Sequence, residues 1–351
     1  MTLVLGNVLI YTAIVGLKME INDEALHGKS RTRNGSWATQ PISALTTEIP
    51  SFNANQRPRS ERRYWPTTRY GYLVAGWFIA IHALAIAGLV IFPFPGWRVF
   101  LAASVLAFLG GASVTICYHR SVAHQSLRLH PVVREIFTLL AMLSGASAPG
   151  SWIPAHRRHH ATTDTPNDPS SPKWGGLFWA HFGWIYQTPA APPKYTLASE
   201  RSYFQRWGRL QIPLLAVALA IGALFGAAAF FWLGAVRLVF CFHGTALVNS
   251  VCHTRPGTPP GMDASRNVGW VGLMQFGIGE CWHQNHHAYP GSARLGWTWR
   301  EPDLGYLLIL ALEKLRLASA VHRSRGPVHC DRPGTPLMSP NGTPPRLRNY
   351  E

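Results

Sequence analysis

Charged side chains are scarce in this sequence of 351 residues. Asp, Glu, Lys and Arg together make up 14% of the residues, whereas apolar residues make up 47%. Soluble domains carry about 25% charged residues, so this composition argues against an ordinary soluble protein. Acidic residues are scarcer than basic ones: the chain has 16 acidic and 32 basic residues, which gives a formal net charge of +16. A basic excess suits either a nucleic acid or an anionic membrane surface, and the positions of the charges decide between them.

The basic residues avoid the apolar parts of the chain. Four apolar segments stand out, at about 70–94, 97–117, 210–232 and 233–252. Among the basic residues only Arg98 and Arg237 lie within them. About 20 apolar residues suffice to span a bilayer, and basic residues confined to the loops mark those loops as cytosolic. The sequence therefore predicts a membrane protein and no nucleic-acid partner, since a nucleic-acid groove needs basic residues interleaved with exposed aromatics.

Cysteine pairs are also missing. The chain has five cysteines, an odd number, and no two of them form a Cys-x-x-Cys motif. We therefore expect no disulfide framework. We expect instead a site that faces the reducing cytosol.

The apolar segments pair into two hairpins. Pro93, Pro95 and Gly96 predict a tight turn between the first two spans, and almost nothing separates the last two. Both termini and all long polar regions then share one face of the membrane. The predicted fold is all-α, with four transmembrane helices in two hairpins and a cytosolic helical cap.

Polar, mostly disordered tails flank this predicted membrane domain of residues 70–325. They cover residues 1–69 and 326–351 and are rich in Pro, Ser, Asn and Arg. A short apolar run from Leu3 to Leu17 is too short to span comfortably and lacks a basic n-region. It remains open whether this run is an over-extended start or an interfacial segment.

Nine of the 16 histidines recur in a tight pattern. They form a first box of His119 and His124, a second box of His156, His159 and His160, a third box of His283, His286 and His287, and a lone His253. Imidazole is the commonest protein ligand for a redox metal at neutral pH. Nine imidazoles are too many for one metal and suit two. The pattern predicts a dinuclear metal enzyme in the membrane.

Spacing within the boxes predicts how the imidazoles point. Positions i, i+3 and i+4 share one face of an α-helix, so the second box should point into one site, as should the third. His119 and His124 are five residues apart, which is about 140° around an α-helix. We therefore expect that they do not serve one metal from a straight helix, and that each approaches from its own angle where the second span ends.

Three further histidines lie in or beside the spans. His82 and His243 fall inside them, and His181 falls in the polar region between the second and third spans. Intramembrane polar residues are often functional. We nevertheless expect a hydrogen-bonded helix contact for both His82 and His243. For His181 we expect either a contact with a metal-ligating side chain or packing, with no metal bound to it directly.

The order and surroundings of the boxes resemble the membrane fatty acyl desaturases of the stearoyl (delta-9) type, over about residues 70 to 320. The resemblance is carried by Tyr118-His119-Arg120, Trp179-Ala-His181-Phe-Gly183-Trp184, Asn249-Ser250-Val-Cys-His253 and Gly279-Glu280-Cys-Trp282-His283-Gln-Asn285-His286-His287. It implies that the nine histidines bind two irons, cycling between Fe2+ and Fe3+, and that Asn249 binds through a water. Glu280, Asp164, Asp168 and Asp303 are candidates to hydrogen-bond the imidazoles and fix their tautomers. Surface ion pairs or helix capping are the alternative for these four carboxylates.

The resemblance also implies an activity: O2-dependent insertion of a double bond, at delta-9, into a saturated fatty acyl chain. Such chemistry on an unactivated methylene needs a metal and O2. Two electrons would come from a separate donor, which could be a ferredoxin, a cytochrome b5-like protein or a flavin reductase. Many acyl-CoA members carry Arg-Asp where this chain has Pro154-Ala155, so a CoA, carrier or lipid head group stays open. The expected location is a bacterial inner membrane, with the active site and both termini cytosolic.

Two other functions remain in view. A fatty acyl hydroxylase could use the same scaffold, because hydroxylation and desaturation diverge only after the first C–H cleavage. A multi-pass metal- or haem-binding transporter is the alternative from another class. A transporter would place carboxylate ligands in the middle of the membrane. The histidine boxes flank the spans instead, which disfavours it.

Overall fold

The computed structural model describes residues 65–188 and 190–324. These residues are helical apart from loops, an isolated bridge between Asn267 and Trp282, and one short antiparallel ladder of β1 (Arg128–Leu129) and β2 (Ala318–Ser319). The predicted all-α class is confirmed. The predicted tails, 1–69 and 326–351, fall almost entirely outside the described residues, as does the run from Leu3 to Leu17.

The first predicted hairpin is present. Helix α2 (Arg69–Ile91) is capped at its N-terminus by Thr68, whose hydroxyl accepts a hydrogen bond from the Gly71 amide at 3.0 Å. A turn ending at Gly96, with φ of +88°, leads into α3 (Trp97–Ser113). Helix α3 then runs without a break into a π-helix, η2 (Val114–Ala123). The second apolar helix therefore extends to residue 123, past the predicted end at 117 and through His119.

The second predicted hairpin turns at a different residue. Its first arm is α9 (Gln211–Ala220) followed by η6 (Ile221–Phe225), and its second arm is α10 (Ala227–Phe231), η7 (Trp232–Val236) and α11 (Arg237–Val251). The turn is Gly226, with φ of +101°, so the predicted boundary between residues 232 and 233 was wrong. A positive φ of this size favours glycine. The reason for the error is that a continuous apolar run hides a turn that a single glycine makes.

Glycines also let the two arms of this hairpin approach closely. A Cβ on Gly222 would lie 2.1 Å from the Ala229 carbonyl oxygen, and one on Gly234 would lie 2.4 Å from that of Leu219. Small residues of this kind let helix backbones pack directly against each other in membrane proteins.

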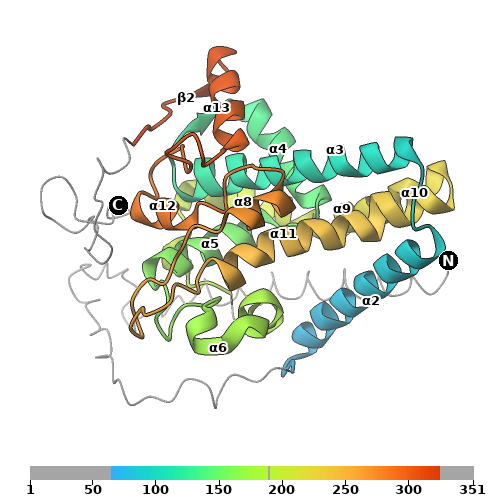
Figure 1. The fold of residues 1–351 in the computed structure, drawn as a ribbon, viewed down its shortest axis with the longest axis horizontal. Coiled ribbons are helices and arrows are strands. Elements are labelled where there is room, and N and C mark those ends of the chain that lie inside the picture. Colours follow the sequence, from blue (N-terminus) through green and yellow to red (C-terminus); the bar gives the residue numbers. More distant parts are fainter. Residues whose placement is uncertain (1–64, 189, 325–351) are drawn as a thin grey trace, which may run out of the picture. The chain divides into compact units, whose positions relative to one another are not determined.

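Three described helices are long and apolar enough to cross a membrane, namely Arg69–Ile91, Trp97–Ala123 and Ala227–Val251. A fourth results only if two consecutive helices are taken together, since Ala198–Arg209 and Gln211–Phe225 meet at a bend of 45°. In Figure 1, α11 and α10 run between α3 and α2.

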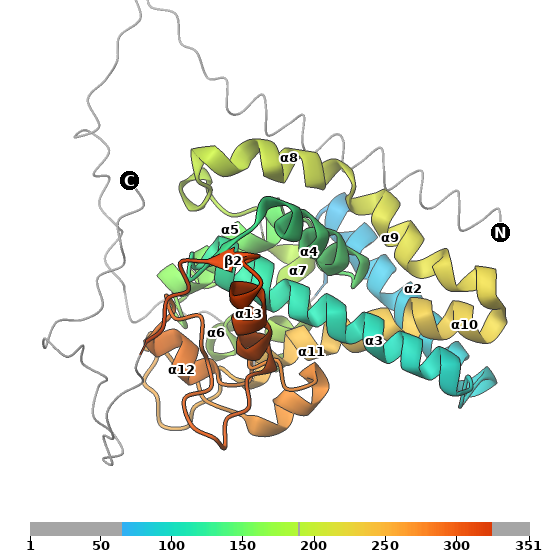
Figure 2. The same cartoon turned by 90° about the horizontal axis from the view of Figure 1, so that it is seen from above.

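Shorter elements gather at one end of the long helices (Figures 1 and 2). They are α4 (Pro131–Leu143), α5 (Pro149–Ala161), α6 (Pro172–Phe178), η3 (Trp179–Gly183), α7 (Trp184–Gln187), η4 (Pro193–Tyr195), η5 (Ala198–Glu200), α8 (Arg201–Arg209), η8 (Gly269–Gln275), α12 (His283–Ala288) and α13 (Leu304–Lys314). The second box lies on α5 and the third box on α12. This end of the molecule therefore brings together boxes that are far apart in the sequence.

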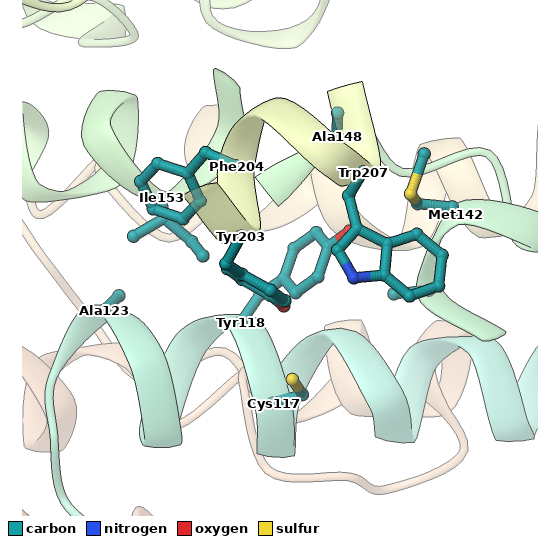
Figure 3. Close-up of a cluster of buried hydrophobic side chains, with 10 residues drawn as sticks. Cys117, Tyr118, Ala123, Met142, Ala148, Ile153, Tyr203, Phe204 and Trp207 are labelled. Atoms are coloured by element: carbon teal, nitrogen blue, oxygen red, sulfur yellow. The ribbon is translucent and has the colours of Figure 1, made fainter. Parts of the chain in front are cut away.

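A buried apolar cluster fixes α5 and α8 against η2 (Figure 3). Its side chains include Cys117 and Tyr118 from η2, Ile153 from α5, and Phe204 and Trp207 from α8. Each fully buried large apolar side chain contributes about 1.5–3 kcal/mol. Because η2 carries the first box and α5 the second, this cluster holds the two boxes in register.

Candidate metal centre

The structure brings all nine histidines of the boxes together, in two groups. The first histidine group is His119, His124, His156, His160 and His286, and the second is His159, His253, His283 and His287. Within each group the ligand atoms lie within 4.8 Å of one another. Each group thus has the donors and the spacing to hold one metal ion.

Each HxxHH box divides between the two groups. His156 and His160, one turn apart on α5, join the first group, and His159 points to the second. Helix α12 does the reverse, giving His283 and His287 to the second group and His286 to the first. The expectation that a whole box points into one site was therefore wrong. In each box, the two imidazoles at positions i and i+4 belong to one histidine group, and the remaining imidazole belongs to the other group.

The first box departs from the predicted geometry because its helix is not α. His119 and His124 both belong to the first histidine group, with ring centroids 4.9 Å apart. The His124 amide donates to the His119 carbonyl at 3.1 Å, the i to i+5 bond of a π-helix. This wider winding brings positions five apart close together, and π-bulges are frequent at functional sites. The expectation concerned a straight α-helix, and it is the π-helix that lets both residues join one group, with their ring planes at 75° to each other.

The Nε2 atoms converge inside each group. In the first group the Nε2 atom of His286 lies 2.9 Å from that of His119 and 2.9 Å from that of His160. In the second group the Nε2 atom of His283 lies 2.9 Å from that of His253 and 3.1 Å from that of His287. The Nδ1 atoms are left to face the surrounding protein.

Four carboxylates meet these outward Nδ1 atoms. Glu280 lies 2.7 Å from His119 Nδ1, Asp168 3.0 Å from His159 Nδ1, Asp164 2.9 Å from His253 Nδ1 and Asp263 3.2 Å from His287 Nδ1. An imidazole that donates Nδ1–H to a carboxylate keeps a lone pair on Nε2, which is the arrangement of metal-binding histidines. Sequence reasoning named the first three of these carboxylates. It missed Asp263, which lies in a loop with no sequence neighbour among the boxes.

The fourth predicted carboxylate does something else. Asp303 contacts no histidine of either group, and instead forms a two-pronged ion pair with the buried Arg120, at 2.9 and 3.1 Å. Arg120 also donates to the carbonyls of Ala293 and Ile278, each at 2.8 Å. This pair joins the residue after His119 to the segments on either side of the third box.

A second buried arginine ties the first box to the second. Arg157 on α5 donates to the carbonyls of Val122 and Ala123, at 2.8 and 3.2 Å, just before His124. Its guanidinium also binds Glu200, at 2.7 and 2.8 Å. Arg157 stands beside His156, so the guanidinium sets the separation of the two boxes.

The donor set fits cations. His253 and His287 each face a carboxylate through Nδ1, so their Nε2 lone pairs point at the same His283 Nε2 atom. Converging lone pairs repel one another unless a positive ion lies among them. A set of neutral imidazoles is the donor set that iron, copper and zinc prefer. The geometry therefore suits a metal in each group.

Burial keeps most of these imidazoles neutral. Burial and neighbouring histidines lower the pKa of His124, His156, His160, His283 and His286 well below the usual value. Burial also lowers the pKa of His287 to about 4, although Asp263 acts in the opposite direction. At His159, burial would lower the pKa, but the Asp168 carboxylate raises it above 6.5. Neutral imidazole is the form that binds a metal.

Asn249, the predicted water-mediated ligand, lies on α11 four residues before His253 and is half-buried. The second histidine group has one imidazole fewer than the first.

Comparison with known proteins shows the family of this chain. The fatty acid desaturase family model matches residues 95–299. The sn-1 stearoyl-lipid 9-desaturase of Synechocystis sp. is 35% identical over 264 residues, covering 73% of this chain and 81% of that protein. The delta-9 acyl-lipid desaturase 2 of Arabidopsis thaliana is 32% identical over 289 residues, covering 78% of this chain and 91% of that protein.

A further relative carries a different specificity in its name. The chloroplastic palmitoyl-monogalactosyldiacylglycerol delta-7 desaturase of Arabidopsis thaliana is 31% identical over 270 residues, covering 74% of this chain and 70% of that protein. Members of this family use iron, and the two histidine groups are sites that could hold it. The chain belongs to the fatty acid desaturase family and is a fatty acyl desaturase.

Proposed function

We propose that this protein inserts a cis double bond at delta-9 of a saturated fatty acyl chain, using two irons, O2 and two external electrons. The observation that carries the proposal is the arrangement of nine imidazoles in two groups with their Nε2 atoms facing inward. The first histidine group would hold one iron through five imidazoles. The second would hold the other through four, with Asn249 binding a water at the remaining position.

The bound irons would supply, together with O2, the oxidant that removes hydrogen from an unactivated methylene. The side chains of this protein hold that chemistry in place. Glu280, Asp164, Asp168 and Asp263 keep the protons on Nδ1 and so aim the Nε2 lone pairs inward. Burial of the imidazoles limits the access of water to the reacting atoms.

We propose an acyl chain carried on a lipid as the substrate. The relatives from Synechocystis and Arabidopsis are named for stearoyl-lipid and acyl-lipid substrates. Pro154 and Ala155 offer no charge where acyl-CoA members carry Arg-Asp, which supports the same choice. The delta-7 name of one relative shows that bond position and head group vary at this level of identity, so both need direct measurement.

We infer four membrane spans, with the bent pair as the third. The two histidine groups and both termini then lie on the cytosolic side, in the inner membrane of a bacterium. The confinement of basic residues to the polar regions supports this orientation. A soluble or membrane-bound donor, such as a ferredoxin, a cytochrome b5-like protein or a flavin reductase, would supply the electrons at that face.

Expression in a desaturase-deficient host tests the proposal. Gas chromatography and mass spectrometry of the total fatty acids should show a new delta-9 monounsaturated product. Analysis of separated lipid classes during a short pulse of labelled fatty acid should find that product first in intact lipids. A hydroxylated product would establish the hydroxylase alternative, and first appearance in acyl-CoA would overturn the lipid-linked substrate.

A further inference from the structure

A segment without charge lies between the last long apolar helix and the third histidine box. From Val268 to Gly279 the chain has no acidic or basic residue, although Arg266 and Glu280 flank it closely. These twelve residues are too few to cross a bilayer, and apolar runs of this length are typical of buried, re-entrant or interfacial segments. The segment contains η8, and the contacts of η8 decide among these three.

Helix η8 has one buried side and one exposed apolar side. Val271, Gly272 and Gln275 are buried, whereas Trp270 is 54% exposed and Leu273 is 80% exposed. A 3₁₀-helix has three residues per turn, so Trp270 and Leu273 lie one above the other on its outer side. Single exposed apolar residues are common on surfaces that face water, so the depth of η8 in the molecule decides what covers this side.

Contacts with the long helices show how deep η8 lies. Phe276, which ends η8, packs against Phe108 of α3 and Phe240 of α11, with ring centroids 6.1 and 5.5 Å apart. The Gln275 amide nitrogen donates to the Gly244 carbonyl of α11 at 2.8 Å. Phe108, Phe240 and Gly244 all lie in helices that are long and apolar enough to cross a membrane. Helix η8 is therefore packed along the side of the spans and not only above their ends.

The length of α3 gives a scale for this depth. Phe94 and Trp97 are exposed at the start of this helix, where aromatic side chains commonly mark a membrane surface. Phe108 follows Trp97 by eleven residues, which is about 16 Å along an α-helix. The hydrocarbon core of a bilayer is about 30 Å thick. Phe276 therefore lies at the depth of this core, in the half nearer the histidine boxes.

The backbone of the segment suits an apolar environment. The Gly277 amide donates to the Gly272 carbonyl at 2.8 Å, and the Ile278 amide donates to the Gln275 carbonyl at 3.2 Å. The Gly277 carbonyl accepts from the Leu304 amide at 2.9 Å. Hydrocarbon offers no hydrogen bonds, so backbone groups at this depth must be paired within the protein. These groups meet that condition.

The exposed apolar surface continues from η8 onto α13. A Cβ placed on Gly277 would lie 3.7 Å from the Leu304 Cδ1 atom, which is ordinary contact. Leu304 and Leu307 are neighbours on one side of α13 and are 39% and 57% exposed. In Figure 1, α13 runs across the direction of α3, as a helix that lies along a membrane surface does. Lys314, the exposed last residue of α13, offers a positive charge to anionic head groups.

We propose that the outer sides of η8 and α13 are immersed in the bilayer leaflet next to the histidine boxes. Lipid acyl chains then cover the exposed side chains of Trp270, Leu273, Leu304 and Leu307. The charge-free segment dips back into the membrane after the last span and leaves it at the start of the third box. This contact with lipid is additional to the four inferred spans.

The immersed segment leads directly into the third box, so the bilayer borders the part of the chain that carries His283. A substrate carried on a membrane lipid would then reach this side of the domain without passing through water. That consequence rests on the proposed function, whereas the immersion itself does not.

Spin labels measure the depth of these side chains directly. Leu273→Cys is made in a full-length background with Cys241→Ala and Cys330→Ser, because Cys117, Cys252 and Cys281 are buried. The nitroxide-labelled protein is placed in proteoliposomes and studied by EPR power saturation. The two relaxation reagents are O2, which concentrates in lipid, and a nickel chelate, which stays in water. We expect the logarithm of the ratio of O2 to nickel collision rates to be positive for the label at position 273.

Three further sites complete the measurement. Val105→Cys, on the exposed side of α3, should also give a positive value. Met262→Cys is the matched control, because Met262 is an exposed apolar residue beside the charged Asp263, and it should give a negative value. Trp270→Cys lies on the same side of η8 as Leu273, should give the same sign, and replaces Leu273→Cys if that variant does not fold.

Negative values at both positions of η8 would overturn the proposal, because water would then cover this side. Low collision rates with both reagents would overturn it as well, because protein, such as a second copy of the chain, would then cover it. None of these measurements uses turnover. A host that gains no unsaturated product would overturn the proposed function and leave the measured depth of η8 unaffected.

Discussion

At the residue scale, the two nitrogens of each imidazole have separate tasks. Nε2 faces its group, and for His119, His159, His253 and His287 a carboxylate meets Nδ1. Mutations can therefore distinguish the roles of the proposed ligands and of their carboxylates. Replacing a histidine removes a metal donor, whereas replacing its carboxylate only loosens the orientation of the imidazole.

Removing one imidazole should disable the centre without unfolding the protein. His160→Ala takes one donor from the first histidine group and none from the second. We expect complete loss of desaturation, with the iron of the first group lost and that of the second retained. Iron analysis of purified protein and fatty-acid profiling of the host check this result. His130→Ala, on an exposed side chain at the start of α4, should leave both unchanged, and full turnover by His160→Ala would contradict the ligand assignment.

Removing a carboxylate should weaken iron binding less severely. Asp263→Asn replaces the carboxylate that faces His287 Nδ1 by an amide of the same size. We expect iron affinity to fall by about 10–100-fold, the usual cost of losing such a partner. Competition with a chelator measures the change. Glu313→Gln, which removes a carboxylate paired with Arg323 far along the chain, should keep wild-type affinity, and an equal loss in both variants would argue against a role for Asp263.

At the element scale, two departures from regular α-helix shape the molecule. The π-helix η2 brings His119 and His124 into one group, and the turn at Gly226 closes the second hairpin. Both depend on local backbone geometry that residue periodicity alone does not reveal.

Close packing of the second hairpin should be sensitive to a single methyl group. Gly222→Ala places a Cβ against the backbone carbonyl of Ala229, which cannot move aside easily. Overpacking of this kind costs about 1–3 kcal/mol, so the melting temperature in detergent should fall. Gly76→Ala in α2 is the matched control, because no atom lies within 4 Å of its added Cβ. That control should keep or slightly raise the melting temperature, and equal melting of the two variants would contradict the packing.

At the scale of the whole molecule, the metal centre joins segments from distant parts of the chain. Imidazoles from η2 and its C-cap, from α5, from α12 and from the turn after α11 meet there with the loops that carry Asp164 and Asp263. Metal ions bound at this point would therefore stabilise the arrangement of the entire domain.

The metal-depleted protein should become less stable as the pH is lowered. Imidazoles of the unfolded chain gain protons below about pH 6.5, whereas the buried ones resist protonation, His287 down to about pH 4. The unfolded state then binds more protons, so the free energy of unfolding decreases as the pH falls through this window. We expect the melting temperature of chelator-treated protein to drop between pH 7.5 and pH 5. A melting temperature that is constant over this range would mean that the imidazoles are not buried without metal.

Much of this protein follows from its sequence by itself. The scarcity of charge and the four apolar segments determine an all-α membrane-type fold, and the boxes with their neighbours identify the nine histidines and three of the four carboxylates that face them. These features are readable because hydrophobic burial and metal ligation both depend on residue type at short, regular spacings.

Only the tertiary structure decided how these parts combine. The sharing of each HxxHH box between two groups and the approach of Asp263 both join segments distant in sequence. The pairing of His119 with His124 and the turn at Gly226 depend on backbone windings that the amino-acid pattern leaves open. The physical reason is that such contacts are selected by the packing of the whole domain, which no local window of the sequence contains.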